Sequence, residues 1–528
     1  MASCGICTAD EALDQQIERF WRLEETTAAT DNNFTQAEKR CETHFIQTTT
    51  RDSIGRFVVW LPFKEAPTCL GESKDIAFRR FIALERRLAN SPDLKKLYKQ
   101  FIEEYLQLGH MQEVSLSQIA KPYYFLPHHC IQKPDSSTTK LRVVFDASAK
   151  TSTNLSLYDI LSTGPTIQDD VFSMLLRFRM PRYVFTTDIE KIYRQELINE
   201  EDQQFQLIWW RSSSNDALKC FKLQTVTYGT TSASYLATKC LQALAQDNKK
   251  RFPLGSTALL RSFYVDDVLT GSDKIAELMT TPSEWQTILQ QGSFKLRKWC
   301  ANHASILKGI LLEDRETELD FSSNVDEHIK TVGLTWMPKS DQLCVKTSWI
   351  EKVRATKRSA YSDIAHLFDP LGIKAPVSVV AKIFLQKLWE LKLDWDATLP
   401  QEMQTTWLKY RKGLQSLNNI KIDRHIFSHR SPKNIQYHIF ADASEKAYGA
   451  AVYVRSVNSD NSITVLLLCS KSRVAPSKQT KLAQQATIPR LELCAACLAT
   501  ELLLRLQKDL KIHNEATFLW TDSEIVFA

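Results

Sequence analysis

Several features of membrane and secreted proteins are missing from this sequence. No uninterrupted apolar stretch is long enough to span a bilayer, and no signal peptide opens the chain. The 12 cysteines do not have the spacing of a disulfide framework. We therefore expect an intracellular protein with reduced thiols and no membrane partner.

The cysteine pairs with CxxC spacing do not predict a zinc site. Cys4 and Cys7 have no second pair of ligands nearby, which a structural zinc site requires. Cys494 and Cys497 lie in a Leu- and Ala-rich helical pattern, so we expect them in a hydrophobic core. Internal repeats and low-complexity tracts are also absent.

The composition is that of an ordinary soluble globular protein, with 43% hydrophobic and 24% charged residues. A length of 528 residues predicts several domains. The net charge of +6 permits a nucleic-acid partner but does not require one.

The most informative stretch is an apolar run, residues 263–269, that is interrupted by Asp266 and Asp267. Aromatic and β-branched residues favour strands, a strand interior disfavours Asp, and Gly271 favours a turn. We therefore expect both acids at a hairpin tip between buried strands. Neighbouring carboxylates repel each other unless a cation lies between them, and Mg²⁺ prefers such oxygen ligands. The alternative is an exposed turn that carries two acids by chance.

A third acid favours the metal interpretation. An apolar segment that starts at Arg182 ends in Asp188, and a turn and a helix-like segment follow. Two strands that present Asp188 and Asp266 side by side would form a two-metal site for phosphoryl transfer.

The sequence around these acids resembles the palm of a reverse transcriptase, and the wider sequence resembles the polyprotein of BEL/Pao-type LTR retrotransposons. The resemblance is carried by Tyr264-Val265-Asp266-Asp267 and by residues 187–195, 141–150, 225–230 and 296–299. It implies an RNA-directed DNA polymerase in which Asp188, Asp266 and Asp267 are catalytic metal ligands. The implied cofactor is Mg²⁺, with Mn²⁺ as the alternative.

The resemblance also implies roles in nucleotide binding. Arg142 matches the fingers arginine that grips the incoming triphosphate, and Lys140 lies close by; pairing of Arg142 with Asp146 is the alternative. Tyr193 matches an aromatic residue that sterically excludes a 2′-hydroxyl, although core packing would also explain it. Gly229 lets the backbone approach the nucleotide closely.

Two further motifs are implied by the same resemblance. One is a palm-edge motif in which Lys295 or Lys298 assists the departure of pyrophosphate, and the sequence does not choose between them. The other is the primer grip, which includes Trp336 and Met337 and whose alternative is an ordinary buried strand.

A second set of acids resembles the site of an RNase H domain. Asp442 and Asp522 end predicted strands, and Glu492 lies near the start of a predicted helix. Glu492 would be costly to bury without a cation, so we expect all three acids to bind metal. RNase H folds carry a fourth acid later in the chain, and the sequence ends at Ala528. We therefore expect an incomplete domain, which argues against RNase H activity.

Together these features predict an α+β and α/β multidomain protein: a right-hand polymerase with fingers, palm and thumb/connection, followed by the incomplete RNase H-like domain. The expected divisions are an N-terminal helical or linker segment (1–110), fingers and palm (111–300), primer grip, thumb and connection (301–430), and the RNase H-like domain (431–528). Residues 77–88 and 91–108 are predicted helices. Trp389, Trp395 and Trp407 are predicted core residues.

The expected partners are an RNA or DNA template with its primer, and dNTPs. Protease and integrase neighbours are expected in the full element but not in this sequence. The Asp-Thr/Ser-Gly signature is absent, so we expect no protease activity. The expected location is the cytoplasm, inside a virus-like particle, or the nucleus. The alternative function is a catalytically decayed or co-opted nucleic-acid-binding protein; a two-metal nuclease would need only the second acid set.

Overall fold

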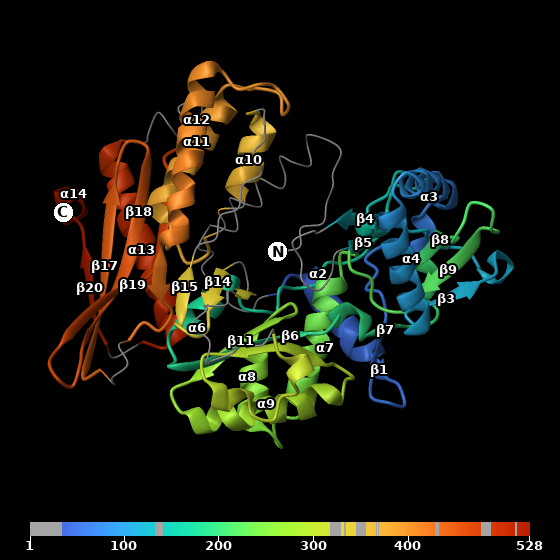
Figure 1. The fold of residues 1–528 in the computed structure, drawn as a ribbon, viewed down its shortest axis with the longest axis horizontal. Helices are drawn as coiled ribbons and strands as arrows, with labels where there is room; N and C mark the ends of the chain where they lie inside the picture. Colours follow the sequence, from blue (N-terminus) through green and yellow to red (C-terminus); the bar gives the residue numbers. More distant parts are fainter. Residues whose placement is uncertain are drawn as a thin grey trace.

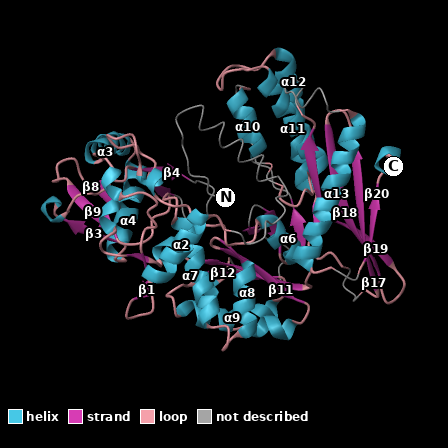
Figure 2. Cartoon of the chain, turned by 180° about the vertical axis from the view of Figure 1, so that it is seen from behind, coloured by secondary structure: helices cyan, strands magenta, loops and turns pink. Residues whose placement is uncertain are grey.

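The computed structural model describes residues 34–132, 141–316, 329–331, 334–344, 355–365, 367, 369–427, 432–476, 487–512 and 515–527. A mixed region of helices and small sheets lies at one end, a sheet covered by helices in the middle, and a larger sheet at the other end (Figure 1). Figure 2 shows the same arrangement from behind. No described helix has the length and apolar character needed to cross a membrane. The predicted multidomain architecture of mixed α and β structure is confirmed.

The N-terminal region combines helices with three small sheets, ordered β1-β2-β7, β3-β9-β8 and β4-β5. Its helices are α2 (Gln36–Thr48), α3 (Lys74–Ala89), α4 (Pro92–Gln107) and α5 (Leu157–Ile160). Its strands are β1 (Thr50–Arg51), β2 (Phe57–Val59), β3 (Met111–Val114), β4 (His128–Gln132), β5 (Leu141–Phe145), β7 (Leu197–Ile198), β8 (Leu207–Trp210) and β9 (Lys219–Leu223). Each of α3 and α4 buries one apolar stripe, as helical periodicity requires. The two helices predicted here are confirmed.

The central sheet has the order β10-β11-β6-β12, and all of its pairs are antiparallel. The strands are β6 (Tyr183–Ile189), β10 (Phe263–Tyr264), β11 (Asp267–Ser272) and β12 (Leu296–Ala301). The helices α7 (Ala233–Asp247), α8 (Pro253–Ser262) and α9 (Ile275–Gln290) cover it (Figure 1). Phe185 of β6 packs against Trp285 of α9 and Trp299 of β12, with both centroid distances 5.4 Å. This packing fixes the strand that carries Asp188.

A third sheet and a group of helices follow. The sheet is β13 (Ile329–Thr331), β14 (Leu334–Met337), β15 (Gln342–Cys344) and β16 (Lys421–Asp423) in that order. The helices are α10 (Lys357–Ala365), α11 (Ala375–Glu390) and α12 (Gln401–Gly413). Trp395 and Trp407 are buried as expected, but the prediction for Trp389 is wrong because its side chain is 41% exposed. Trp389 lies instead beside Lys357, whose Nζ is 4.1 Å from its ring centroid.

The C-terminal sheet has the order β19-β18-β17-β20, and β17 and β20 are parallel. Its elements are β17 (Asn434–Ala443), β18 (Ala447–Val457), β19 (Ile463–Val474), β20 (Ala516–Trp520), α13 (Ile488–Leu510) and α14 (Glu524–Phe527). The buried stripe of α13 includes Leu491, Leu498 and Leu502. Cys494 and Cys497 are exposed, so their predicted core position is wrong. Because Leu and Ala occur on several faces of this helix, the composition did not show that Cys494 and Cys497 lie on the exposed face.

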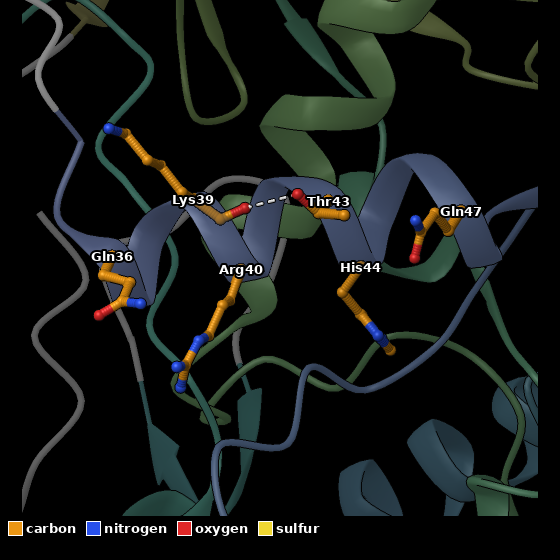
Figure 3. Close-up of a pocket in the computed structure, with 6 residues that line it drawn as sticks. All are labelled: Gln36, Lys39, Arg40, Thr43, His44 and Gln47. Carbon is orange, nitrogen blue, oxygen red and sulfur yellow. Dashed lines mark hydrogen bonds between the residues drawn. The ribbon is translucent and has the colours of Figure 1, made fainter.

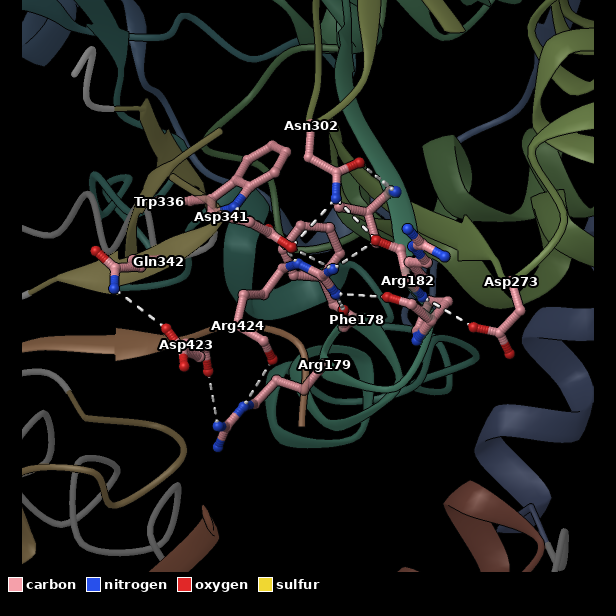
Figure 4. A network of polar contacts seen from close by, with 12 residues as sticks. Phe178, Arg179, Arg182, Asp273, Asn302, Trp336, Asp341, Gln342, Asp423 and Arg424 are labelled. Atoms are coloured by element: carbon pink, nitrogen blue, oxygen red, sulfur yellow. Dashed lines mark hydrogen bonds and ion pairs between the residues drawn. The ribbon is translucent and has the colours of Figure 1, made fainter. Parts of the chain in front are cut away.

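Two fully buried arginines lie where α6 meets the third sheet (Figure 4), and one of them, Arg179, also bonds to the C-terminal sheet. Arg179, at the end of α6 (Val171–Arg179), donates to the backbone carbonyls of Asp423, Arg424, Leu467 and Leu468. Arg424 binds both carboxylate oxygens of Asp341, at 2.7 and 2.8 Å. It also donates to the carbonyls of Phe178, Pro181 and Arg182. One hydrophobic cluster spans α6, Trp336 and the C-terminal sheet with α13.

Candidate active site

The sheet register brings the first set of acids together. In the antiparallel pair of β11 and β6, Asp267 lies directly opposite Asp188. Residues directly opposite one another share a face of the sheet. The amide of Ile189 donates to the carbonyl oxygen of Asp266 at 2.9 Å. Asp266 is therefore anchored to the end of the strand that carries Asp188.

The predicted hairpin tip is also present. Tyr264 pairs with Asp267, so Val265 and Asp266 form a two-residue turn. Val265 has φ +59°, which is strained for a β-branched residue. The side-chain oxygen of Gln168 accepts a hydrogen bond from the Val265 amide at 3.1 Å. Such strain clusters at functional sites, and here it exposes Asp266 at the tip.

Two cations hold Asp188. Lys298 Nζ lies 2.6 Å from Asp188 Oδ2, and Arg297 Nε lies 3.2 Å from Asp188 Oδ1. A register shift in β12 and a positive φ of +55° at Lys298 place both side chains there. Lys295 instead pairs with Asp314 at 2.8 Å. Of the two lysines that the sequence left open, Lys298 is therefore the one in contact with the acids.

The pKa of Asp266 is raised, first by desolvation and then by the charge of Asp188, while Lys298 and Arg142 oppose the shift. Asp266 as a residue is exposed at the turn. Many protein atoms nevertheless surround its carboxylate, and they reduce the hydration of its charge. A divalent cation would lower the cost of this concentration of negative charge. Carboxylate oxygens are the ligands that Mg²⁺ and Mn²⁺ prefer, but in the described residues the oxygens of Asp188, Asp266 and Asp267 do not all lie within 4.8 Å of one another.

Arg142 and Tyr193, two of the predicted nucleotide-binding residues, lie near the first set of acids. Arg142 lies 5.7 Å from the ring centroid of Tyr228, and its charge acts on both Tyr193 and Asp266. It has no ion pair with Asp146, which pairs with Arg80 instead. That alternative for Arg142 is therefore wrong. Burial raises the pKa of Tyr193, whose hydroxyl lies 3.2 Å from Ser234 Oγ.

Gly229 occupies a position that excludes any side chain. Its φ is +102°, and a Cβ there would lie 2.4 Å from the carbonyl oxygen of Phe145. Phe145 ends β5, which also carries Arg142. Gly229 therefore lets two backbone segments meet beside the candidate nucleotide site.

Three remaining predictions have different outcomes. Lys140 lies outside the described residues. Trp336 and Met337 are fully buried in β14, and the Trp336 indole N–H donates to Asp341 at 3.0 Å. Their burial agrees with the alternative of an ordinary buried strand, and the primer grip stays a prediction.

The second set of acids forms a tight cluster. Asp442, Glu492 and Asp522 each place a carboxylate oxygen within 4.8 Å of the others. Phe440 pairs with Trp520 in the parallel β17–β20 register, and Asp442 and Asp522 each follow two residues later. The carboxyl ends of parallel strands meet at one edge of the sheet, which explains why these two acids lie side by side. Within the described ranges, this is the one group of three ligating side chains that is this close.

Glu492 shows that the cluster fits a cation. Its side chain is buried and its Oε2 atom has no hydrogen-bond partner in the described part of the chain. Its pKa is raised, first by burial and then by the charges of Asp442 and Asp522. A buried, unpartnered carboxylate oxygen beside two further acids is the donor set of a hard divalent cation.

Sequence reasoning missed the contacts of Arg297 and Lys298 with Asp188. The segment has a basic pair before Trp299, which suggested a phosphate contact but not an ion pair across the sheet. A β-bulge turns the side chains, and no residue type in this segment signals a bulge.

One family model matches part of the chain. Residues 356–523 match the Pao retrotransposon-like RNaseH-like domain, which confirms the predicted resemblance to a Pao-type retroelement over these residues. The match begins at α10, ahead of the C-terminal sheet, and it includes all three acids of the second set. No curated protein matches the chain.

Two solved structures show a weaker similarity. One is the foamy viral protease-reverse transcriptase dRH in complex with double-stranded DNA, with 14% identity and a TM-score of 0.42. The similarity covers 81% of this chain and 69% of that one. The other is the foamy viral protease-reverse transcriptase in complex with an RNA/DNA hybrid, with 14% identity and a TM-score of 0.44. It covers 82% of this chain and 54% of that one.

Proposed function

We propose that this chain is the RNA-directed DNA polymerase of a Pao-type retroelement, which transfers a nucleotide from a dNTP to a primer 3′-hydroxyl on an RNA or DNA template. The observation that carries the proposal is the register of Asp188 opposite Asp267, with Asp266 on the adjoining turn. This arrangement fits a metal-assisted phosphoryl transfer.

The residues around the acids fit the steps of this reaction. Asp188, Asp266 and Asp267 would hold Mg²⁺ or Mn²⁺, which activates the primer hydroxyl and neutralises the triphosphate when bound. Asp188 is free to bind metal once its oxygens are released by Lys298 and Arg297, which lie 2.6 and 3.2 Å away. The released Lys298 ammonium can then donate a proton to the departing pyrophosphate.

Two other side chains would select and orient the dNTP. The Arg142 guanidinium can bind triphosphate oxygens in a bidentate manner, and it has no ion pair in the described part of the chain. The ring of Tyr193, held through Ser234, would occupy the space that a ribonucleotide needs for its 2′-hydroxyl. Together they favour a deoxyribonucleoside triphosphate.

The second acid set favours a second candidate activity, metal-dependent hydrolysis of RNA in an RNA/DNA hybrid. The convergence of Asp442, Glu492 and Asp522 carries it. In that reaction the three carboxylates would hold the cation, and Glu492, already buried, would gain the partner that it lacks in the described residues. Incubation of an RNA/DNA hybrid with the parent protein and Mg²⁺ would test the expectation that this activity is missing, since cleavage of the RNA strand would contradict it.

Primer extension with Mg²⁺ on a poly-ribonucleotide template tests the proposal. We expect the parent protein to extend the primer and Asp266→Asn to fail, while primer–template binding remains. Asp93→Asn, an exposed acid in the first turn of α4, is the matched control and should extend normally.

Two outcomes would contradict the proposal. Full extension by Asp266→Asn would overturn the metal assignment. Binding of primer–template without extension by the parent would favour the decayed or co-opted nucleic-acid-binding protein. The same Pao-type assignment suggests a cytoplasmic particle or the nucleus as the location, which immunostaining of expressing cells would test.

A further inference from the structure

One face of α2 is polar and basic. A hollow of about 340 Å³ is lined by Gln36, Lys39, Arg40, Thr43, His44 and Gln47, which Figure 3 shows along one helix. Lys39 and Arg40 are exposed, and neither has an ion pair in the described ranges of the chain. The lining therefore offers two uncompensated positive charges together with the side-chain amides of Gln36 and Gln47, while the Thr43 hydroxyl donates to the Lys39 carbonyl at 2.9 Å.

The two acids of α2 do not neutralise this face. Glu38 is held at the helix start by a capping box, in which its carboxylate accepts from Thr35 at 2.8 Å. Glu42 accepts from Lys239 at 2.5 Å and from Tyr235 at 2.8 Å, on the side of α2 that packs against α7. The carboxylate of Glu38 is therefore bound at the helix start, and that of Glu42 lies against α7.

His44 adds a second observation. Its Nε2 atom is buried in the wall of the hollow and has no hydrogen-bond partner in the described part of the protein. A buried ring nitrogen without a partner costs stability. Because this nitrogen is buried, a ligand in the hollow would meet the rest of the ring, and the positive charge of the face comes from Lys39 and Arg40.

The face lies one helix away from the first acid set. The contacts of Glu42 dock α2 onto α7, and the first turn of α7 carries Ser234. Ser234 Oγ lies 3.2 Å from the hydroxyl of Tyr193, on whose pKa the charge of Asp266 acts. Both views of the molecule show α2 beside α7 (Figures 1 and 2).

We propose that this face of α2 binds the sugar–phosphate backbone of the template–primer. The inference rests on the proposed polymerase function and identifies a contact surface for its substrate. Cations and amides are groups that bind phosphate oxygens without reading sequence. The lining contains no carboxylate that would repel phosphate and no Phe, Tyr or Trp that would stack on bases.

The salt dependence of binding tests this proposal. We would measure the Kd of a labelled primer–template by fluorescence anisotropy over a range of KCl concentrations, without dNTPs. For the Lys39→Ala/Arg40→Ala double variant we expect the slope of log K against log salt to become shallower by about 2, since each lost phosphate contact contributes about 0.9. The affinity at low salt should fall about tenfold, independently of sequence.

The matched control is Lys95→Ala/Lys96→Ala, which removes two exposed lysines of α4 that have no ion pair in the described residues. Its slope should match that of the parent protein. Thr43→Glu, which adds a negative charge within the hollow, should weaken binding independently of the first variant. Circular dichroism would verify that each variant is folded.

The outcomes separate this proposal from the polymerase assignment. Parental Kd and slope in both α2 variants would overturn the role of α2, whatever the result of primer extension. A parent that binds but does not extend the primer would contradict only the polymerase function. A parent that does not bind the primer–template would overturn the α2 proposal as well.

Discussion

Arg424 joins the chain after β16 to the end of α6, to the residues before β6 and to the turn before β15, and its loss should weaken this junction. It is fully buried, and its guanidinium binds Asp341 through two hydrogen bonds of 2.7 and 2.8 Å. Arg424→Met keeps a side chain of similar length but removes every donor. Asp341 would lose its charge partner, and the carbonyls of Phe178 and Pro181 would lose a donor. The carbonyl of Arg182 would keep the side-chain amide of Asn302 at 2.8 Å.

The expected cost follows from what the substitution leaves behind. Removal of one partner of a buried ion pair costs about 3–5 kcal/mol because the other charge remains buried. Asp341 keeps donors from Trp336 at 3.0 Å and from Asn302 at 3.2 Å. We therefore expect about 3 kcal/mol, at the lower end of that range.

A chain of several domains does not unfold in one step, so the assay must report local stability. Hydrogen exchange of the amides in β14 and β17 measures the free energy of opening the shared cluster. In the Arg424→Met/Asp341→Asn double variant the charge is removed on both sides. Its cost should be smaller than the sum of the single costs by about 1–3 kcal/mol.

The matched control is Arg358→Met. Arg358 binds Asp396 with the same bidentate geometry, at 2.8 and 2.9 Å, but on the surface. Exposed ion pairs contribute little, so exchange should hardly change. Unchanged protection of β14 and β17 in Arg424→Met, or additive costs in the double variant, would refute the reasoning.

Three further predictions address single positions. Tyr193→Ala should admit ribonucleotides, and an unchanged ratio of dNTP to rNTP incorporation would contradict the gate. Gly229→Ala should lower primer extension more than about tenfold, because a φ of +102° and a carbonyl 2.4 Å from the new Cβ strain the backbone; a thermal melt would show whether the fold survives. Burial, with a smaller contribution from Glu201, raises the pKa of Asp202 to about 6, so the folded state keeps this proton while the unfolded state releases it near its ordinary pKa. The free energy of unfolding therefore falls as pH rises from the ordinary pKa of Asp to about 6. Above pH 6, Asp202→Asn should be more stable than the parent by up to about 3 kcal/mol. Urea unfolding at pH 5 should show a smaller difference between the two proteins.

Local patterns predicted much of the fold and of the site. The apolar stripes of α3 and α4 set their helices, and the acids at the ends of β6 and β17 were recognisable because Asp interrupts apolar runs. Both acid sets lie where strand ends meet, which strand periodicity already indicates.

What the sequence did not reveal depends on long-range packing. The hydrogen bond between Arg179 and Arg424 joins positions 245 residues apart, and nothing local to either arginine marks it as buried. The bulge at Lys298 and the solvent-facing side of α13 likewise arise from neighbouring elements. Tertiary context sets these features, and residue type alone does not.

The shared cluster of α6, β14 and the C-terminal sheet makes the distance between the two acid sets a property of the folded body. Ser173 of α6 and Asp509 of α13 reinforce it with a 2.6 Å hydrogen bond. A duplex bound across both sets would therefore span a distance that the packing of this cluster sets. If the second acid set cleaved one strand of that duplex, the fragment length would follow from the distance between the two sets. Loss of the Arg424 contacts would then make the fragment lengths more variable.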